Sequence, residues 1–160
     1  YLTNIYFDQK NYEKAAYYIS KALSIDESDA ICWRRYSEIK LKLNFFEEAV
    51  KGFEMCLSLK DEDINVFIAL VDVLTFVGEF NAALNTLIKA QKVHKNFAEI
   101  EYRFAGLFWV LNKQKFGIEH LIKAMNIDYD YHIILKELYP SVYFNESIQK
   151  LISDFKKATE

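Results

Sequence analysis

The sequence predicts an all-α protein built from repeated pairs of antiparallel helices. Three observations lead to this prediction. Only four glycines and one proline occur in 160 residues, which leaves little material for the turns that connect strands. Apolar residues recur three and four positions apart, which is the spacing of residues on one helix face. Small residues recur at a fixed interval along most of the chain, which indicates a tandem repeat.

The composition argues against several classes of protein. Apolar residues make up 52% of the chain and aromatic residues 16%. No apolar run reaches the roughly 18 to 20 residues that span a bilayer, so we expect no membrane insertion. The formal net charge is −3 at pH 7. Because binding to a phosphate backbone depends on clustered lysine and arginine, we also expect no nucleic-acid partner.

Two series of small residues and one series of bulky residues carry the repeat. Within each series, every residue lies 34 positions after the one before it. The bulky residue follows the first small residue by four positions, so the two share a helix face. The first small series is Ala15, Ala49, Ala83 and Gly117, the second is Ala22, Cys56, Ala90 and Ala124, and the bulky series is Ile19, Phe53, Leu87 and Leu121.

The second repeat carries a known signature most completely. Its motif residues are Trp33-x-x-Tyr36-Ser37, Ala49-x-x-x-Phe53 and Cys56-Leu57. This pattern resembles the tetratricopeptide repeat (TPR), with its signature W-x-x-L-G-x-x-Y, A-x-x-x-F and A. The resemblance covers residues 1 to about 131, and it implies a right-handed superhelix of antiparallel helical hairpins.

The resemblance also assigns borders within a single TPR array over residues 1–160. A partial repeat at 1–29 precedes complete repeats at 30–63, 64–97 and 98–131, and C-terminal capping helices follow at 132–160. Because the first helix of the first repeat is cut short, we expect further repeats before Tyr1. The segment from Asn145 is predicted to be an amphipathic helix that covers the open core face of the last repeat.

The family pattern is not kept everywhere in this chain. The proline usual near the end of a TPR unit is replaced by Glu27, Asp61, Lys95 and Tyr129. Lys40 and Glu101 stand where TPR proteins prefer bulky apolar side chains, and Gly117 replaces the first alanine of its unit. Helix starts are predicted from capping residues. Asn44 and Asn96, each followed by a glutamate three residues later, resemble capping boxes, and Asp29, Asp63 and Asp130 lie near the starts of other helices.

No catalytic or metal-binding motif is recognisable in the sequence. The histidines His94, His120 and His132 are not accompanied by a recognisable nucleophile motif, and Cys32 and Cys56 fit neither a metal-ligand spacing nor a disulfide framework. The acidic clusters fall at repeat boundaries and are interpreted as loops and caps rather than as cation sites. We therefore predict a protein that is not an enzyme, without catalytic residues, cofactor or metal.

The resemblance implies a function in binding other proteins. In TPR arrays the first helices of the pairs line a concave groove that holds a peptide segment. We therefore predict a protein–protein interaction scaffold with a protein or peptide partner. A structural or self-association module that forms homo-oligomers is an alternative, and a helical-repeat RNA-binding protein is a less favoured one. The compartment is not set, with a slight preference for the cytoplasm.

By the same analogy, nine residues on the first helices are expected to line the groove. The mixture of charges among neighbouring positions predicts a partner of mixed or basic polarity with apolar anchors. The expected groove residues are Phe7, Arg34, Glu38, Leu41, Ile68, Asp72, Phe76, Tyr102 and Trp109.

The aromatic groove residues have two interpretations, because aromatic side chains dominate many binding sites but also complete cores. If Trp109 lies in the groove, Trp109→Ala weakens partner binding in a pulldown and leaves the helical content, measured by circular dichroism, unchanged. A loss of helical content would identify Trp109 as a core residue instead.

Overall fold

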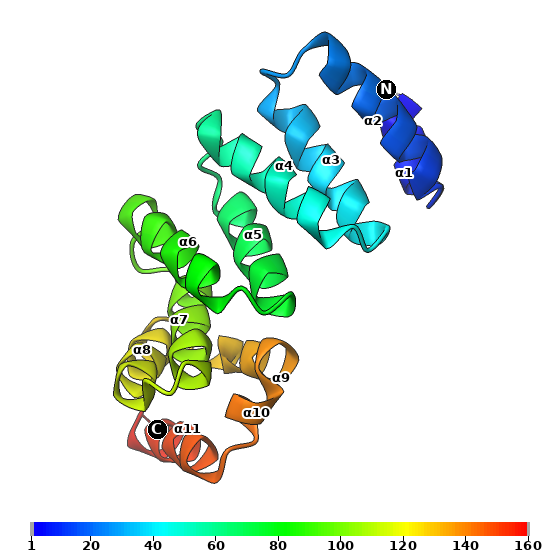
Figure 1. Ribbon diagram of the computed structural model, residues 1–160. Coiled ribbons are helices and arrows are strands. Elements are labelled where there is room, and N and C mark those ends of the chain that lie inside the picture. Colours follow the sequence, from blue (N-terminus) through cyan, green and yellow to red (C-terminus); the bar gives the residue numbers. More distant parts are fainter. Residues whose placement is uncertain (1, 160) are drawn as a thin grey trace. The chain divides into compact units, whose positions relative to one another are not determined.

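The computed structural model describes residues 2–159, and within this range the regular elements are helices joined by turns and short loops, without a strand (Figure 1). Tyr1 and Glu160, the outer ends of the predicted first and last segments, lie outside the described residues. The chain divides into two compact units, Tyr1–Glu79 and Phe80–Glu160. Their boundary falls inside the predicted repeat 64–97, between its two helices. No helix of residues 2–159 is long and apolar enough to cross a membrane.

The first unit is a succession of helices in which each packs against the next along the chain. Part of its core is formed by Ala15, Ile19 and Ile39, with Tyr6 and Tyr36 packed around them. The helices are α1 (Leu2–Asp8), α2 (Tyr12–Ile25), α3 (Ala30–Lys42), α4 (Phe46–Ser58) and α5 (Ile64–Phe76).

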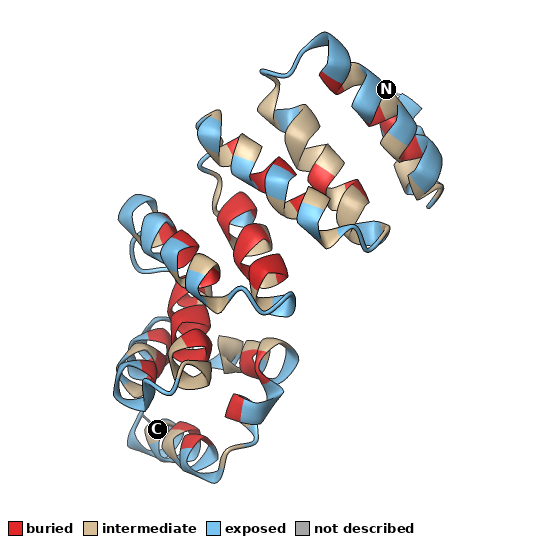
Figure 2. Cartoon of the chain, in the orientation of Figure 1, coloured by how far each residue is buried: buried red, intermediate tan, exposed pale blue. Residues whose placement is uncertain are grey.

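The second unit is built around α7, which is buried along most of its length (Figure 2). The helix α8, which follows α7 in the sequence, makes the most extensive contact with it. The helix α6, which precedes α7, also packs on it. The helices are α6 (Phe80–Val93), α7 (Ala98–Val110), α8 (Gln114–Ile127), the short 3₁₀ helix η1 (Asp130–Ile133), α9 (Ile134–Leu138), α10 (Pro140–Tyr143) and α11 (Glu146–Thr159).

The predicted interval of 34 residues is visible in the helix starts. The first helices α3, α5 and α7 begin at Ala30, Ile64 and Ala98, and the second helices α2, α4, α6 and α8 begin at positions 12, 46, 80 and 114. Seven of the eight small residues of the register are buried, and Ala22 is half-buried. At Gly117 an added Cβ would lie only 3.1 Å from the carbonyl oxygen of Ala105, so the close approach of α8 to α7 accounts for the glycine.

The aspartate caps are confirmed at two helix starts. The carboxylate of Asp29 accepts hydrogen bonds from the backbone N–H groups of Ile31 and Cys32 at the start of α3. Asp63 accepts from the backbone N–H of Asn65 at the start of α5. Near Asp130, the capping carboxylate is instead that of Asp128, which accepts a hydrogen bond from the backbone N–H of Tyr131.

The capping boxes predicted at Asn44 and Asn96 are wrong. Both asparagines have left-handed backbones, with φ of 61° and 60°, whereas an N-cap residue is usually extended. The residues that follow them, Phe45 and Phe97, occupy the N-cap positions of α4 and α7 and make no side-chain capping bond. Asn44 belongs instead to a series of turn residues spaced 34 apart, Lys10, Asn44, Gly78 and Asn112, all with positive φ.

The last helix, α11, begins where the sequence predicted it. The side chain of Asn145 accepts hydrogen bonds from the backbone N–H groups of Ser147 and Ile148. Ile148 and Ile152 are buried, and the ring of Phe155 stacks on Tyr129 just after α8, with ring centroids 6.0 Å apart. The predicted apolar stripe therefore faces the preceding repeat.

The burial of Ala49 gives a direct test of the small-residue contacts. Ala49 is completely buried, so Ala49→Leu should overpack the contact between α4 and α3 and lower the free energy of unfolding by about 1–3 kcal/mol. Urea denaturation followed by circular dichroism measures this change. Ala158→Leu, at an exposed position of α11, is the control, and equal stability of the two variants would contradict the assignment.

Candidate protein-binding surfaces

Seven of the predicted groove residues lie on the first helices of the first unit. Phe7 lies on α1, and the others lie on α3 and α5. Six of them are half-buried, and Phe76 is 72% exposed. We call these seven residues together with Ile31 of α3 the first-helix face of unit 1; its members are Phe7, Ile31, Arg34, Glu38, Leu41, Ile68, Asp72 and Phe76.

Arg34 on this face is held by two aspartates that precede α5. Its Nη2 lies 2.7 Å from both carboxylate oxygens of Asp61, and its Nη1 lies 3.4 Å from Asp63. A guanidinium bound to a carboxylate by several N–H groups is a directed and comparatively strong contact. Arg34 therefore links α3 to the start of α5, a structural role that the sequence did not reveal.

A second arginine links α1 to α3. The guanidinium of Arg35 lies over the ring of Phe7 at 4.7 Å, and its Nη1 forms a 2.7 Å ion pair with Glu38 one helical turn away. Phe7 and Glu38 are therefore both engaged within the unit. Their positions are fixed by these contacts before any partner arrives.

The most exposed large apolar side chains of these helices are Ile31 and Phe76. Ile31, in the first turn of α3, is 78% exposed. Phe76, at the end of α5, contacts the ring of Phe46 with centroids 4.9 Å apart but otherwise faces solvent. Exposed apolar side chains beside ordered polar groups are typical of binding surfaces.

In the second unit, the corresponding face of α7 is covered by the chain itself. Tyr102, predicted in the groove, is completely buried, and its hydroxyl donates to the backbone carbonyl of Asp128 at 2.8 Å. The ring of Tyr139 lies so close to Gly106 that an added Cβ would collide with it. Tyr102 is thus part of the core, whereas Trp109 is half-buried with its ring beside Gly117.

The departure from the TPR pattern at Glu101 is explained by a buried polar cluster. Glu101 is 5% exposed and accepts hydrogen bonds from Nε2 of Gln91 at 2.8 Å and from Nδ1 of His120 at 2.5 Å. The ring of His120 stacks on Phe104 with centroids 4.6 Å apart. Burial by itself acts to raise the pKa of Glu101, but the hydrogen bonds from His120 and Gln91 hold it below its ordinary value.

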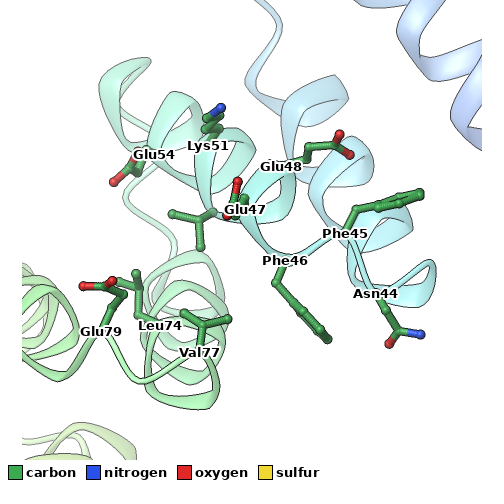
Figure 3. Close-up of a pocket in the computed structure, with 11 residues that line it drawn as sticks. Asn44, Phe45, Phe46, Glu47, Glu48, Lys51, Glu54, Leu74, Val77 and Glu79 are labelled. Carbon is green, nitrogen blue, oxygen red and sulfur yellow. The ribbon is translucent and has the colours of Figure 1, made fainter.

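A hollow of about 740 Å³ lies in the first unit between α4 and the end of α5 (Figure 3). We call it the acidic hollow. Apolar side chains from both helices line it, and four glutamates stand among them with a single lysine. Its residues are Asn44, Phe45, Phe46, Glu47, Glu48, Val50, Lys51, Glu54, Leu74, Val77 and Glu79. The sequence shows the glutamates of α4, but it does not show which part of α5 lies beside them.

The second unit has a hollow of opposite polarity, of about 600 Å³. Its lining includes three lysines, three side-chain amides and the buried Glu101. The residues are Gln91, Lys92, Lys95, Asn96, Glu101, Lys123, Asn126 and Ile127. Among residues 2–159 there is no group of three or more histidine, cysteine, aspartate or glutamate side chains that could hold a metal ion.

Comparison with known proteins gives matches among solved structures. No protein-family model and no curated protein matches the sequence. A crystal structure of MamA is similar, with a TM-score of 0.76 at 15% identity, covering 100% of this chain and 98% of that one. MamA 41-end from Desulfovibrio magneticus RS-1 has a TM-score of 0.76 at 18% identity, with 99% and 89% covered.

A further match is a structure described as a thermophilic TPR protein, TTC0263 of Thermus thermophilus. Its TM-score is 0.60 at 18% identity, and the match covers 88% of this chain and 79% of that one. At these identities the likeness concerns the fold. The fold is that of helical-repeat proteins of the TPR type, which confirms the resemblance drawn from the motif residues.

The polar cluster at Glu101 makes stability depend on pH in a defined direction. A carboxyl whose pKa is lowered in the folded state stabilises the fold above its ordinary pKa of 4.5, and this contribution is lost as the pH falls through the lower folded value. Glu101→Gln should therefore lower the free energy of unfolding by about 1–3 kcal/mol at pH 7. The deficit should shrink in acid.

Urea denaturation at neutral pH and at several pH values below 4.5 measures this difference. Glu119→Gln, an exposed residue next to His120 in sequence, is the matched control. A deficit that is the same at every pH would show that the charge of Glu101 is not what stabilises the fold.

Proposed function

We propose that this protein is a scaffold for protein–protein interaction and that the first-helix face of unit 1 holds a segment of a partner protein. The observation that carries the proposal is the exposure of Ile31 and Phe76, at 78% and 72%, on helices whose neighbouring charged side chains are held in place. An apolar anchor of the partner would contact these two side chains. Burial of apolar area would supply most of the affinity.

The ion pairs of this face support the proposal because they lower the entropic cost of binding. Arg34 is held by Asp61, and Arg35 is held by Glu38 and Phe7. Side chains that are already ordered lose little freedom when a partner binds. The remaining polar atoms of these ion pairs can donate hydrogen bonds to a polypeptide backbone, or accept hydrogen bonds from it, without rearrangement.

The difference between the two units supports placing the partner on unit 1. In unit 2 the face of α7 is covered by Tyr139 and its neighbours, and Tyr102 is buried. A partner there would have to displace packed side chains. The likeness to solved TPR structures supports a scaffold rather than an enzyme.

The proposal is tested with the double variant Ile31→Ser, Phe76→Ser as bait in a quantitative pulldown. Proteins that bind this face should be retained by the wild type and lost from the variant, by about tenfold or more, because each substitution removes an exposed apolar contact. Unchanged thermal unfolding of the variant would show that the fold is intact.

The matched control is Ile25→Ser, Phe144→Ser, which removes the same side chains from positions that are 86% and 64% exposed outside this face. Equal retention by the two double variants would overturn the proposal. Light scattering over a concentration series separates the alternative, a self-association module, because only that alternative predicts a mass that rises with concentration.

A further inference from the structure

We propose that the acidic hollow is a second docking surface, separate from the first-helix face, for a partner segment that carries lysine or arginine side chains around an apolar anchor. Figure 3 shows Glu47, Lys51 and Glu54 along α4, with Leu74, Val77 and Glu79 on the side of α5. The surface is thus a cleft with two walls, and both walls belong to unit 1.

The centre of the acidic hollow suits an apolar side chain. Leu74 is buried, Val50 is half-buried, and Val77 is 42% exposed, so the apolar wall is partly open to solvent. The volume of about 740 Å³ is in the range of pockets that enclose ligands. A leucine or phenylalanine of a partner would bury this exposed apolar surface and displace water from it.

The rim of the acidic hollow attracts positive charge. Glu48 forms a 2.8 Å ion pair with Lys40, whereas Glu47, Glu54 and Glu79 are exposed and form no ion pair with any residue in the range 2–159. Lys51 is the one cation among the lining residues. Three unpaired carboxylates against one ammonium group favour a cationic segment and disfavour an acidic one.

The charge of the chain argues for a basic partner rather than a second copy of the protein. The chain has a formal net charge of −3, and two copies that met through their acidic hollows would bring carboxylates against carboxylates. A lysine-rich amphipathic segment would instead satisfy both the apolar centre and the carboxylate rim. Its binding should weaken as salt is added, because the rim charges are exposed.

The first experiment locates the site with a fluorescein-labelled amphipathic peptide of lysine, leucine and alanine whose leucines share one helix face. Added to the ¹⁵N-labelled protein, the peptide should shift the amide resonances of residues 45–54 and 74–79. A peptide with glutamate in place of every lysine, and one with alanine in place of every leucine, should shift them much less.

The second experiment removes the rim charges. Glu47→Gln, Glu54→Gln, Glu79→Gln in one protein should weaken binding of the lysine peptide, measured by fluorescence anisotropy, about tenfold, since each exposed charge pair contributes a factor of about two to three. The control Glu27→Gln, Glu119→Gln, Glu137→Gln removes the same charge at exposed positions that do not line the hollow. It should change the affinity less than about twofold.

The third experiment removes part of the apolar wall. Val77→Ser should weaken binding severalfold. The control is Val93→Ser, which should leave binding unchanged, because Val93 is 45% exposed, close to the 42% of Val77, but does not line the hollow. Both positions are near helix ends, so both variants should fold.

Four outcomes would overturn the inference. Equal effects of the rim and control triple variants, or equal binding of the glutamate peptide, would show that the rim charges do not select the ligand. Amide shifts at Arg34, Glu38 and Ile68 without shifts at residues 45–54 would place the peptide on the first-helix face, which refutes the hollow and leaves the proposed function standing. Concentration-dependent dimers of the wild type that the rim triple variant abolishes would identify a second copy as the occupant.

Discussion

The structure depends on the close approach of paired helices at their small residues. Ala15 and Ala49 have no exposed surface, and at Gly117 even a methyl group would press on the backbone of α7. Helices of 13 or 14 residues are marginal alone in water. Their stability therefore comes from packing, and packing at this distance requires small side chains on the inner face. The bulky residue one turn later, such as Ile19 or Phe53, is buried as well.

The sequence predicted the parts of the fold that follow from side-chain size and spacing. The residue pattern predicts the helix starts, the buried small residues and the capping by Asp29 and Asp63. The asparagines were misread because Asn is favoured both at N-caps and in left-handed turns, and the sequence alone does not separate these two uses. The acid in place of an apolar residue at Glu101 was also visible, but its partners come from other helices and are known only from the structure.

The candidate site was less predictable, because exposure depends on what packs beside a helix. Phe76 and Tyr102 were assigned to one face by the same argument from spacing. Phe76 is open, whereas Tyr102 is covered, since the chain after α8 returns to α7 and places Tyr139 over Gly106. Arg34 occupies a groove position in the pattern, yet it is held by Asp61, which stands where a proline is usual between TPR units. A family pattern predicts which residues lie on one face of a helix, but it does not predict which of them are exposed.

The left-handed turn residues at Lys10, Asn44, Gly78 and Asn112 have a consequence for how such a chain can diverge. Each of them fixes the path of the backbone between two helices, so an insertion or deletion there would rotate the second helix and misplace its small residues. Repeat length is therefore constrained by backbone conformation, and the turn position favours glycine or asparagine, although Lys10 shows that another residue can adopt it. The interval of 34 residues can therefore persist in the helix starts while the residue at one signature position changes from Trp33 to Phe67 to Glu101 between repeats.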